Sequence, residues 1–241
     1  PDRIAKVLEL SGSFGIAEGA WPRQRDVFLS LIDGLLFGDD PREGFIRDRT
    51  FLHPNLRFAF DVPEGFNLQN SSDAVFVLGP EGSAMRFDGV DIPPRQSLER
   101  FVRNVWARGV TVQDMVSGQV GGMEAVFGAA RHGGWNYRLA AVRFAPDKVF
   151  RFLLAARNID ASLEDGFHST VNSLRSLSAE EAAQARPLRI RTVQVGANDN
   201  QRSMARRMVL NDNALEQFRI LNGLSASSRL TAGQSVKIIA E

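Results

Sequence analysis

Between Phe45 and Ala156 the apolar residues of this chain recur at every second position in a series of short runs. The first run alternates apolar and polar positions up to the break at Pro63 and Gly65, in the order Leu56, Arg57, Phe58, Ala59, Phe60, Asp61. Such alternation is typical of a half-buried β-strand. Further strands are expected at residues 74–78, 83–90, 111–120, 123–131, 137–144 and 149–156. This region is therefore expected to form a β-sheet.

The turn residues between these runs favour antiparallel pairing. Gly121-Gly122 separates two runs and is a hairpin signal. Between the last two runs lies Ala145-Pro146-Asp147-Lys148, in which proline at the second position favours a type I turn. Neighbouring strands in the sequence are thus expected to be neighbours in the sheet.

Segments with helical spacing flank and interrupt the strands. One is expected at residues 2–10 and a second at residues 23–37, which should end at Gly38 and pack its apolar face into the core. Two more are expected at residues 97–108, with Leu98, Phe101, Val102 and Val105 on one face, and at 162–177, where Asp160 or Ser162 can cap the helix. Helices that cover a mostly antiparallel sheet make an α+β fold. The order and lengths of the elements over residues 45–178 resemble PsbP-like sandwiches.

A change of unit is expected at Pro187, after an Ala- and Glu-rich stretch. We expect a helical segment at 1–44, an α+β sandwich at 45–186 and a small module at 187–241. Residues 187–241 hold eight basic and four acidic side chains, a net charge of +4, whereas residues 1–186 hold 21 and 24, a net charge of −3. The positive charge of the small module suggests attraction to an anionic polymer. The alternative is that the charge is unevenly distributed over a solvated surface and has no ligand.

The small module has the predicted order β-α-α-β, with elements at 189–195, 201–208, 214–221 and 235–240. Two of its sequences are distinctive: Leu221-Asn222-Gly223-Leu224, and Gly233-Gln234-Ser235-Val236-Lys237-Ile238. In this order they resemble a LysM domain over its whole length. A small core of Met204, Leu215, Phe218 and Leu221 against Val193, Val195, Val236 and Ile238 is consistent with such a module.

LysM domains bind polymers that contain N-acetylglucosamine, in a shallow groove between two loops. The resemblance implies that the glycan-binding residues here are Gly196, Ala197, Asn198 and Asp199 in the first loop and Leu224, Ser225, Ala226 and Arg229 in the second. Gly196-Ala197-Asn198 replaces the family's usual Gly-Asp-Thr turn. The alternative is a LysM fold that serves only in packing within its own protein.

Several segments of the first 66 residues resemble a second family. They are Pro1-Asp2-Arg3-Ile4, then Leu35-Leu36-Phe37-Gly38-Asp39-Asp40-Pro41 with Gly44-Phe45, and Phe51-Leu52-His53-Pro54 with Pro63 and Gly65-Phe66. They resemble the C-terminal extensions of exported bacterial HtpX-like zinc metallopeptidases, which end in a LysM-like module. The resemblance implies a periplasmic or cell-envelope location and a parent zinc endopeptidase whose zinc lies in a catalytic domain outside this chain.

The chain itself is expected to be non-catalytic and to hold no cofactor. The family's His-Glu-x-x-His motif is absent, and His53, His132 and His168 have no histidine partner four residues on. There is no cysteine, no Gly-x-Ser-x-Gly and no Gly-x-Gly-x-x-Gly. Asp39, Asp40 and Glu43 are better explained as turn and cap residues than as a catalytic pair.

Two roles therefore compete. The region either tethers a protease to peptidoglycan, or another glycan, and positions substrates, or it binds its own protease domain or envelope proteins as an autoregulatory lid. Nucleic acid is not an expected partner, because no aromatic residues interleave Arg202, Arg206 and Arg207. The sequence contains no apolar stretch of transmembrane length, and it neither shows nor excludes an export signal that has been removed.

Overall fold

The computed structural model describes residues 24–209 and 213–241, so the helix expected at residues 2–10 lies outside the described part. The described chain divides into two compact units, one spanning Gly38–Pro187 and the other joining residues 24–37 with Leu188–Glu241. Each unit has its own hydrophobic core. Residues 24–37 thus fold with the C-terminal module, a pairing that the expected division into 1–44, 45–186 and 187–241 does not contain.

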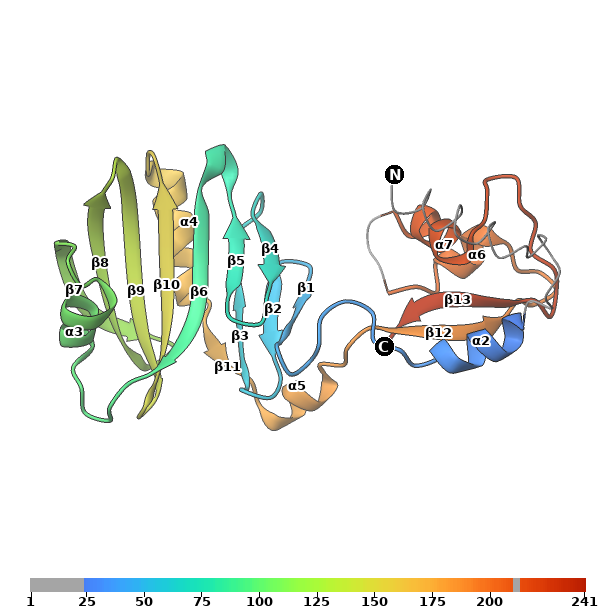
Figure 1. Ribbon diagram of the computed structural model, residues 1–241, viewed down its shortest axis with the longest axis horizontal. Helices are drawn as coiled ribbons and strands as arrows, with labels where there is room; N and C mark the ends of the chain where they lie inside the picture. Colours follow the sequence, from blue (N-terminus) through green and yellow to red (C-terminus); the bar gives the residue numbers. More distant parts are fainter. Residues whose placement is uncertain (1–23, 210–212) are drawn as a thin grey trace, which may run out of the picture. The chain divides into compact units, whose positions relative to one another are not determined.

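The Gly38–Pro187 unit is built on a seven-stranded sheet in which every strand pair is antiparallel. Its strand order is β4-β5-β6-β10-β9-β8-β7 (Figure 1). The strands are β4 (Asn67–Asn70), β5 (Val75–Leu78), β6 (Ala84–Asp91), β7 (Val112–Val120), β8 (Met123–His132), β9 (Trp135–Ala145) and β10 (Lys148–Ala156). The expected class, α+β with a mostly antiparallel sheet, is confirmed.

A two-residue turn sets the register of the hairpin between β7 and β8. Gly121 and Gly122 both have positive φ, at 55° and 82°, and connect the paired residues Val120 and Met123. Glycine adopts this conformation without the steric cost that a Cβ atom brings, which is why such turns favour it. The hairpin signal in the sequence was therefore correct.

Helices cover both faces of this sheet. On one face lie α3 (Leu98–Phe101) and the π-helical turn η2 (Val102–Trp106), over a core that includes Val126, Leu139 and Ala141. On the other face α4 (Ala161–Asn172) packs on a second core, rich in phenylalanine, that it shares with a small sheet of order β1-β2-β3-β11. The small sheet consists of β1 (Phe45–Arg47), β2 (Thr50–His53), β3 (Phe58–Asp61) and β11 (Arg175–Ser176). The 3₁₀ turn η1 (Pro80–Gly82) precedes β6, and α5 (Ala179–Gln184) ends the unit.

The helix expected at 97–108 changes character halfway. The backbone N–H of Ala107 donates to the carbonyl of Val102, five residues back, at 2.8 Å. This wider turn moves Val105 off the face that it would share with Leu98 and Phe101 in an α-helix, and its side chain is exposed. The prediction that Val105 faces the core was wrong for this reason.

Other boundaries also differ from the expected ones. Leu56 does not belong to the strand of Phe58 and Phe60, because residues 54–57 form a turn in which Arg57 has a φ of 57°. As a result Leu56 is exposed. The helix expected to reach residue 177 ends at Asn172, and Arg175–Ser176 instead pairs with β3. The strands β1, β2 and β4 were not anticipated.

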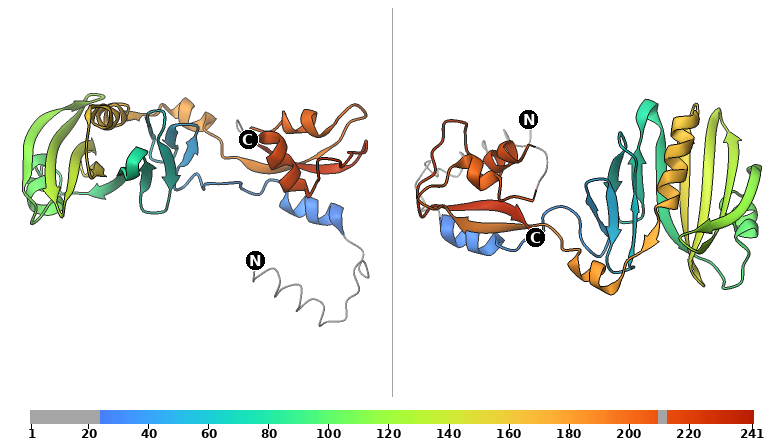
Figure 2. Two further views of the ribbon diagram at one scale, coloured as in Figure 1. Left: turned by 90° about the horizontal axis from the view of Figure 1, so that it is seen from above. Right: turned by 180° about the vertical axis from the view of Figure 1, so that it is seen from behind.

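The second unit places a sheet between helices. Strands β12 (Arg189–Gln194) and β13 (Ser235–Ala240) pair antiparallel, with α6 (Gln201–Ala205) and α7 (Ala214–Asn222) on one face and α2 (Arg25–Ile32) on the other (Figures 1 and 2). Met204, Phe218 and Val236 are fully buried in its core. Gly223 ends α7 with a φ of 64°, in the left-handed conformation expected of it. The β-α-α-β order agrees with the expectation, whereas α2 is an addition to it.

Helix α2 is shorter than the expected 23–37 and packs differently. It ends at Ile32, after which Gly34 and Phe37 donate backbone hydrogen bonds to the carbonyls of Ile190 and Leu188. The chain therefore extends the sheet along β12 where the sequence predicted more helix. Of the helix, Leu29 alone is buried among the described residues, while several apolar residues are exposed: Val27, Phe28, Leu31, Leu35 and Leu36. The expectation that this run belongs to the core holds for Leu29 and, in part, for Phe37, which packs against the core of the unit, and was wrong for the exposed residues.

Candidate functional site

The C-terminal unit brings together two loops, one between β12 and α6 and one between α7 and β13. The first begins at Val195, whose N–H donates to the carbonyl of Gln234, and whose own carbonyl accepts from Gly233. These bonds continue the β12–β13 pairing past the end of the strands. The start of the first loop is thereby held beside the end of the second.

Asp199 organises the first loop. Its carboxylate accepts hydrogen bonds from the backbone N–H of Gly196 at 2.9 Å and from the Ser203 hydroxyl at 2.9 Å. These two donors, with Arg207 3.8 Å away, hold the pKa of Asp199 below its usual value. Asn200 then caps α6, because its side-chain oxygen accepts from the N–H groups of Arg202 and Ser203. The loop is therefore a fixed structure with an ionised carboxylate at neutral pH.

Gln201 joins the two loops. Its side-chain amide donates to the carbonyls of Ser225 at 3.0 Å and Ser228 at 2.6 Å, and its oxygen accepts from the Arg219 guanidinium at 2.6 Å. The residue is 8% exposed, so these partners satisfy a buried polar group. Sequence reasoning missed Gln201, since nothing in its neighbourhood along the chain indicates that it is buried.

A shallow hollow of about 400 Å³, which we name the loop hollow, lies where the two loops meet. It is lined by Asp199, Asn200, Gln201, Arg202, Arg219, Ala226, Ser228, Arg229 and Leu230. Of the eight residues that the LysM resemblance implied, Asp199, Ala226 and Arg229 line it. The other five do not: Gly196, Ala197, Asn198, Leu224 and Ser225. Leu224 packs against the core of the unit, and Ser225 accepts the hydrogen bond from Gln201.

The loop hollow is electropositive at its rim. Three arginines line it against one carboxylate. Arg219 is engaged by Gln201, whereas Arg202 and Arg229 are exposed and their guanidinium groups have no partner within residues 24–209 and 213–241. Together with exposed hydroxyl and amide groups, the site offers donors for a polar, neutral or anionic ligand, with Leu230 and Ala226 as its apolar part.

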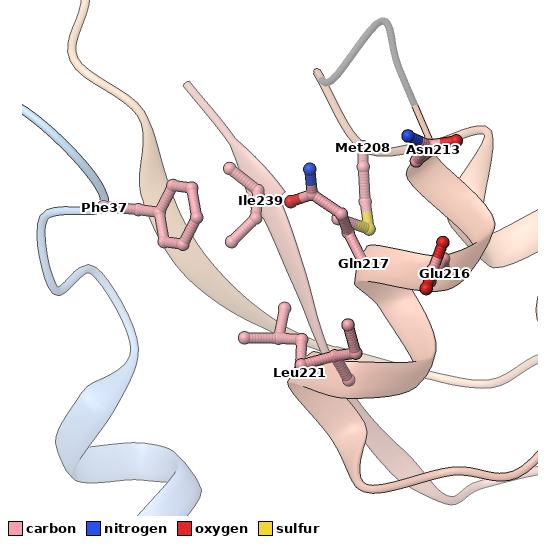
Figure 3. A pocket seen from close by; sticks show the side chains of 8 residues that line it. Phe37, Met208, Asn213, Glu216, Gln217, Leu221 and Ile239 are labelled. Carbon is pink, nitrogen blue, oxygen red and sulfur yellow. The ribbon is translucent and has the colours of Figure 1, made fainter. Parts of the chain in front are cut away.

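The same unit has a second hollow of a different character, seen in Figure 3. It measures about 410 Å³, and its apolar lining comes from Phe37, Met208, Ile220, Leu221 and Ile239. Ile220 is 74% exposed there. Three polar residues, Asn213, Glu216 and Gln217, also line it, and the Gln217 amide points between Ile239 and Met208 (Figure 3). This apolar hollow has the composition of a protein-contact surface rather than of a sugar site.

The three histidines lie on three different elements. His53 is on β2, between Phe51 and Phe58, and burial lowers its pKa. His168 is on α4 and contacts Glu164, and His132 ends β8. In the described residues, no three His, Asp or Glu side chains come close enough together to hold a metal ion. No helix within the same residues is both long and apolar enough to cross a membrane.

Comparison with known proteins gives structural likenesses only. No family model and no curated protein matches the chain. A crystal structure from Bacteroides thetaiotaomicron is similar over 74% of this chain, with 8% sequence identity and a TM-score of 0.42, and this chain spans 60% of its length. The solution structure of a cyanobacterial PsbP protein from Synechocystis is similar over 58% of this chain and 98% of its own, with 12% identity and a TM-score of 0.41. Likenesses at these TM-scores carry no argument about function.

Proposed function

We propose that this chain is a non-catalytic accessory region whose C-terminal unit is LysM-like and binds peptidoglycan or another glycan containing N-acetylglucosamine. The observation that supports the proposal is the loop hollow itself. The two loops implied by the sequence resemblance meet there, and the buried side chain of Gln201 ties them together. A recognition site needs such pre-organised loops, since ordering them on binding would cost affinity.

The chemistry of the loop hollow suits a cell-wall polymer. Sugar hydroxyl and N-acetyl groups are recognised by short polar groups and backbone amides around a small apolar surface, and the hollow combines these with Leu230 and Ala226. Arg202 and Arg229 add positive charge, which attracts a polymer that carries carboxylates. Tethering to the cell wall would then hold the rest of the protein in the periplasm or cell envelope.

The parent protein in this proposal is an exported HtpX-like zinc metallopeptidase. Its support is the sequence resemblance around Gly38-Asp39-Asp40-Pro41 and Phe51-Leu52-His53-Pro54. In this proposal the catalytic zinc lies in the parent's own catalytic domain, and no three His, Asp or Glu side chains come together among the described residues of this chain. A His-Glu-x-x-His motif encoded upstream of Pro1 would support this parentage, and an unrelated domain there would contradict it.

Co-sedimentation with insoluble peptidoglycan tests glycan binding. We expect the purified chain to pellet with the polymer, and Arg229→Ala to weaken binding about five- to tenfold. The matched control is Arg206→Ala, which removes the same charge from an exposed position of the same unit outside the loop hollow. Wild-type protein that stays in the supernatant, or equal losses for both variants, would contradict a specific site.

A second candidate function is the binding of a protein partner, such as the parent's own catalytic domain. The apolar hollow of Figure 3 and the exposed face of α2 favour it. Phe28, Leu31 and Ile220 are each more than half exposed. Here the LysM-like fold would be purely structural. Mixing the chain with the isolated protease domain tests this role: Ile220→Lys should abolish the complex but not glycan binding, and the absence of any complex with wild-type chain would refute it.

A further inference from the structure

Strand β7 forms one end of the seven-stranded sheet and, among the described strands, pairs only with β8. Such an edge offers a row of backbone N–H and C=O groups to another strand. Proteins commonly protect an edge with charged residues or proline, but residues 115–120 read Met-Val-Ser-Gly-Gln-Val and contain neither. The side chains of residues 115–120 therefore do not block the addition of another strand to β7.

A β-bulge shapes the strand just before this open part. The β7–β8 register shifts between Gln113 and Val116, and Asp114 has a φ of 50°. Bulges bend a strand and redirect its side chains, and they occur often beside binding sites. Val116, the first residue after the bulge, is 62% exposed although it is β-branched and apolar.

A groove of about 440 Å³ runs beside this edge. Its walls come from β7 and α4, and its floor comes from β8 and β9. At the end of β7 the gap to α4 closes, since a Cβ atom on Gly121 would lie 3.1 Å from the carbonyl oxygen of Leu174, just past α4. The groove is lined by Asp114, Val116, Phe127, Gly128, Ala129, Arg138, Glu164, Phe167 and His168.

Most charges in the groove already satisfy one another. The Arg138 guanidinium donates to both carboxylate oxygens of Glu164 at 2.9 and 2.8 Å, and His168 lies 3.3 Å from the same carboxylate. Asp114 is exposed and, within the described part of the chain, has no ion pair or side-chain hydrogen bond. The remaining surface, from Val116, Phe127 and Ala129, is apolar. The groove therefore presents an apolar patch with one uncompensated negative charge.

We propose that this groove binds an extended polypeptide segment that adds to β7 as an eighth strand and carries an apolar side chain next to a basic one. The peptide backbone would pair with residues 116–120, its apolar side chain would cover Val116 and Phe127, and its basic side chain would lie near Asp114. Backbone pairing supplies affinity that does not depend on sequence, and the side-chain contacts supply selectivity. The site lies in the Gly38–Pro187 unit and shares no residue with the loop hollow, so it does not depend on glycan binding.

An array of blocked heptapeptides tests this proposal on the full chain. The central residue of the peptides is varied among the apolar amino acids, and the residues next to it are varied among Lys, Arg, Asp and Ser. The bound peptides should combine an apolar centre with Lys or Arg, and their affinity should fall at least tenfold with Val116→Lys. The matched control, Gln69→Lys, adds the same charge to an exposed residue of β4, the strand at the other end of the same sheet and outside the groove, and should change affinity less than twofold. Asp114→Asn should remove the preference for Lys and Arg.

Backbone pairing has its own test. Two versions of the tightest-binding peptide are made, one N-methylated at its odd-numbered amides and one at its even-numbered amides. Only one of the two versions should bind at least tenfold more weakly, because only one set of N–H groups faces β7. The proposal is overturned if no array member binds, if Val116→Lys binds as well as wild type, or if neither N-methylated peptide binds more weakly than the unmodified one. A concentration-dependent dimer that Val116→Lys abolishes would also overturn it, in favour of pairing between copies of this chain.

Discussion

His53 is a titratable residue held among aromatic side chains. Its ring lies 5.3 Å from that of Phe58, centroid to centroid, and its Nδ1 accepts the backbone N–H of Leu56 at 3.2 Å. Burial lowers its pKa, so the folded protein holds it neutral, whereas in the unfolded chain it protonates near its ordinary pKa of about 6.5. The contribution of neutral His53 to the free energy of unfolding is therefore fully present above about pH 6.5. It is lost as the pH falls through the lower pKa of the folded state, because the unfolded chain then binds a proton that the folded protein does not.

We therefore predict that the Gly38–Pro187 unit loses stability between about pH 7 and pH 5, in part through His53. Urea denaturation across this range measures the effect. In His53→Asn, the side-chain oxygen can still accept the Leu56 N–H but does not titrate, so the decline should be shallower. A pH profile identical to that of wild type would assign the acid sensitivity to other groups.

Gln201 allows a second test at the scale of one residue. Gln201→Leu would leave the carbonyls of Ser225 and Ser228 and the guanidinium of Arg219 without their partner. Buried groups left unsatisfied cost about 1 to 3 kcal/mol, so we expect a loss of that size in the free energy of unfolding. Gln217→Leu, at an exposed position of α7, should cost less than about 0.5 kcal/mol. Equal effects would show that Gln201 does not hold the loops.

At the scale of elements, α4 depends on the residue that caps its N-terminus. The sequence left open whether Asp160 or Ser162 caps this helix, and in the structure the Asp160 carboxylate accepts the N–H of Leu163 at 2.8 Å. Asp160→Ala should therefore cost about 1 kcal/mol of stability by chemical denaturation. Ser162→Ala, two residues on and exposed, should have little effect. A larger loss in Ser162→Ala than in Asp160→Ala would contradict this assignment.

The elements that local sequence signals could predict are those that local chemistry determines. The hairpin at Gly121-Gly122 and the helix end at Gly223 were readable because glycine alone tolerates these conformations at no cost. The strand at Arg175–Ser176 and the extended segment after Ile32 were not, because each forms only through a partner far along the chain, β3 and β12 respectively. The same holds for the loop hollow: a resemblance indicated its two loops, whereas Gln201 and Arg219 join them only in the folded unit.

At the scale of the whole molecule, two segments far apart in the sequence, residues 24–37 and 188–241, form one unit. Leu29 of α2 is 3% exposed, and the Leu29 carbonyl accepts the Thr192 hydroxyl at 3.1 Å, 163 residues away. Leu29→Ala should cost about 2 to 5 kcal/mol, as buried leucines do. Because each unit has its own core, we expect faster amide hydrogen exchange in residues 188–241 and unchanged exchange in residues 38–187. Leu31→Ala, on the same helix but 77% exposed, is the matched control and should alter neither. If Leu29→Ala left exchange in residues 188–241 unchanged, α2 would not be part of the unit that holds the loop hollow.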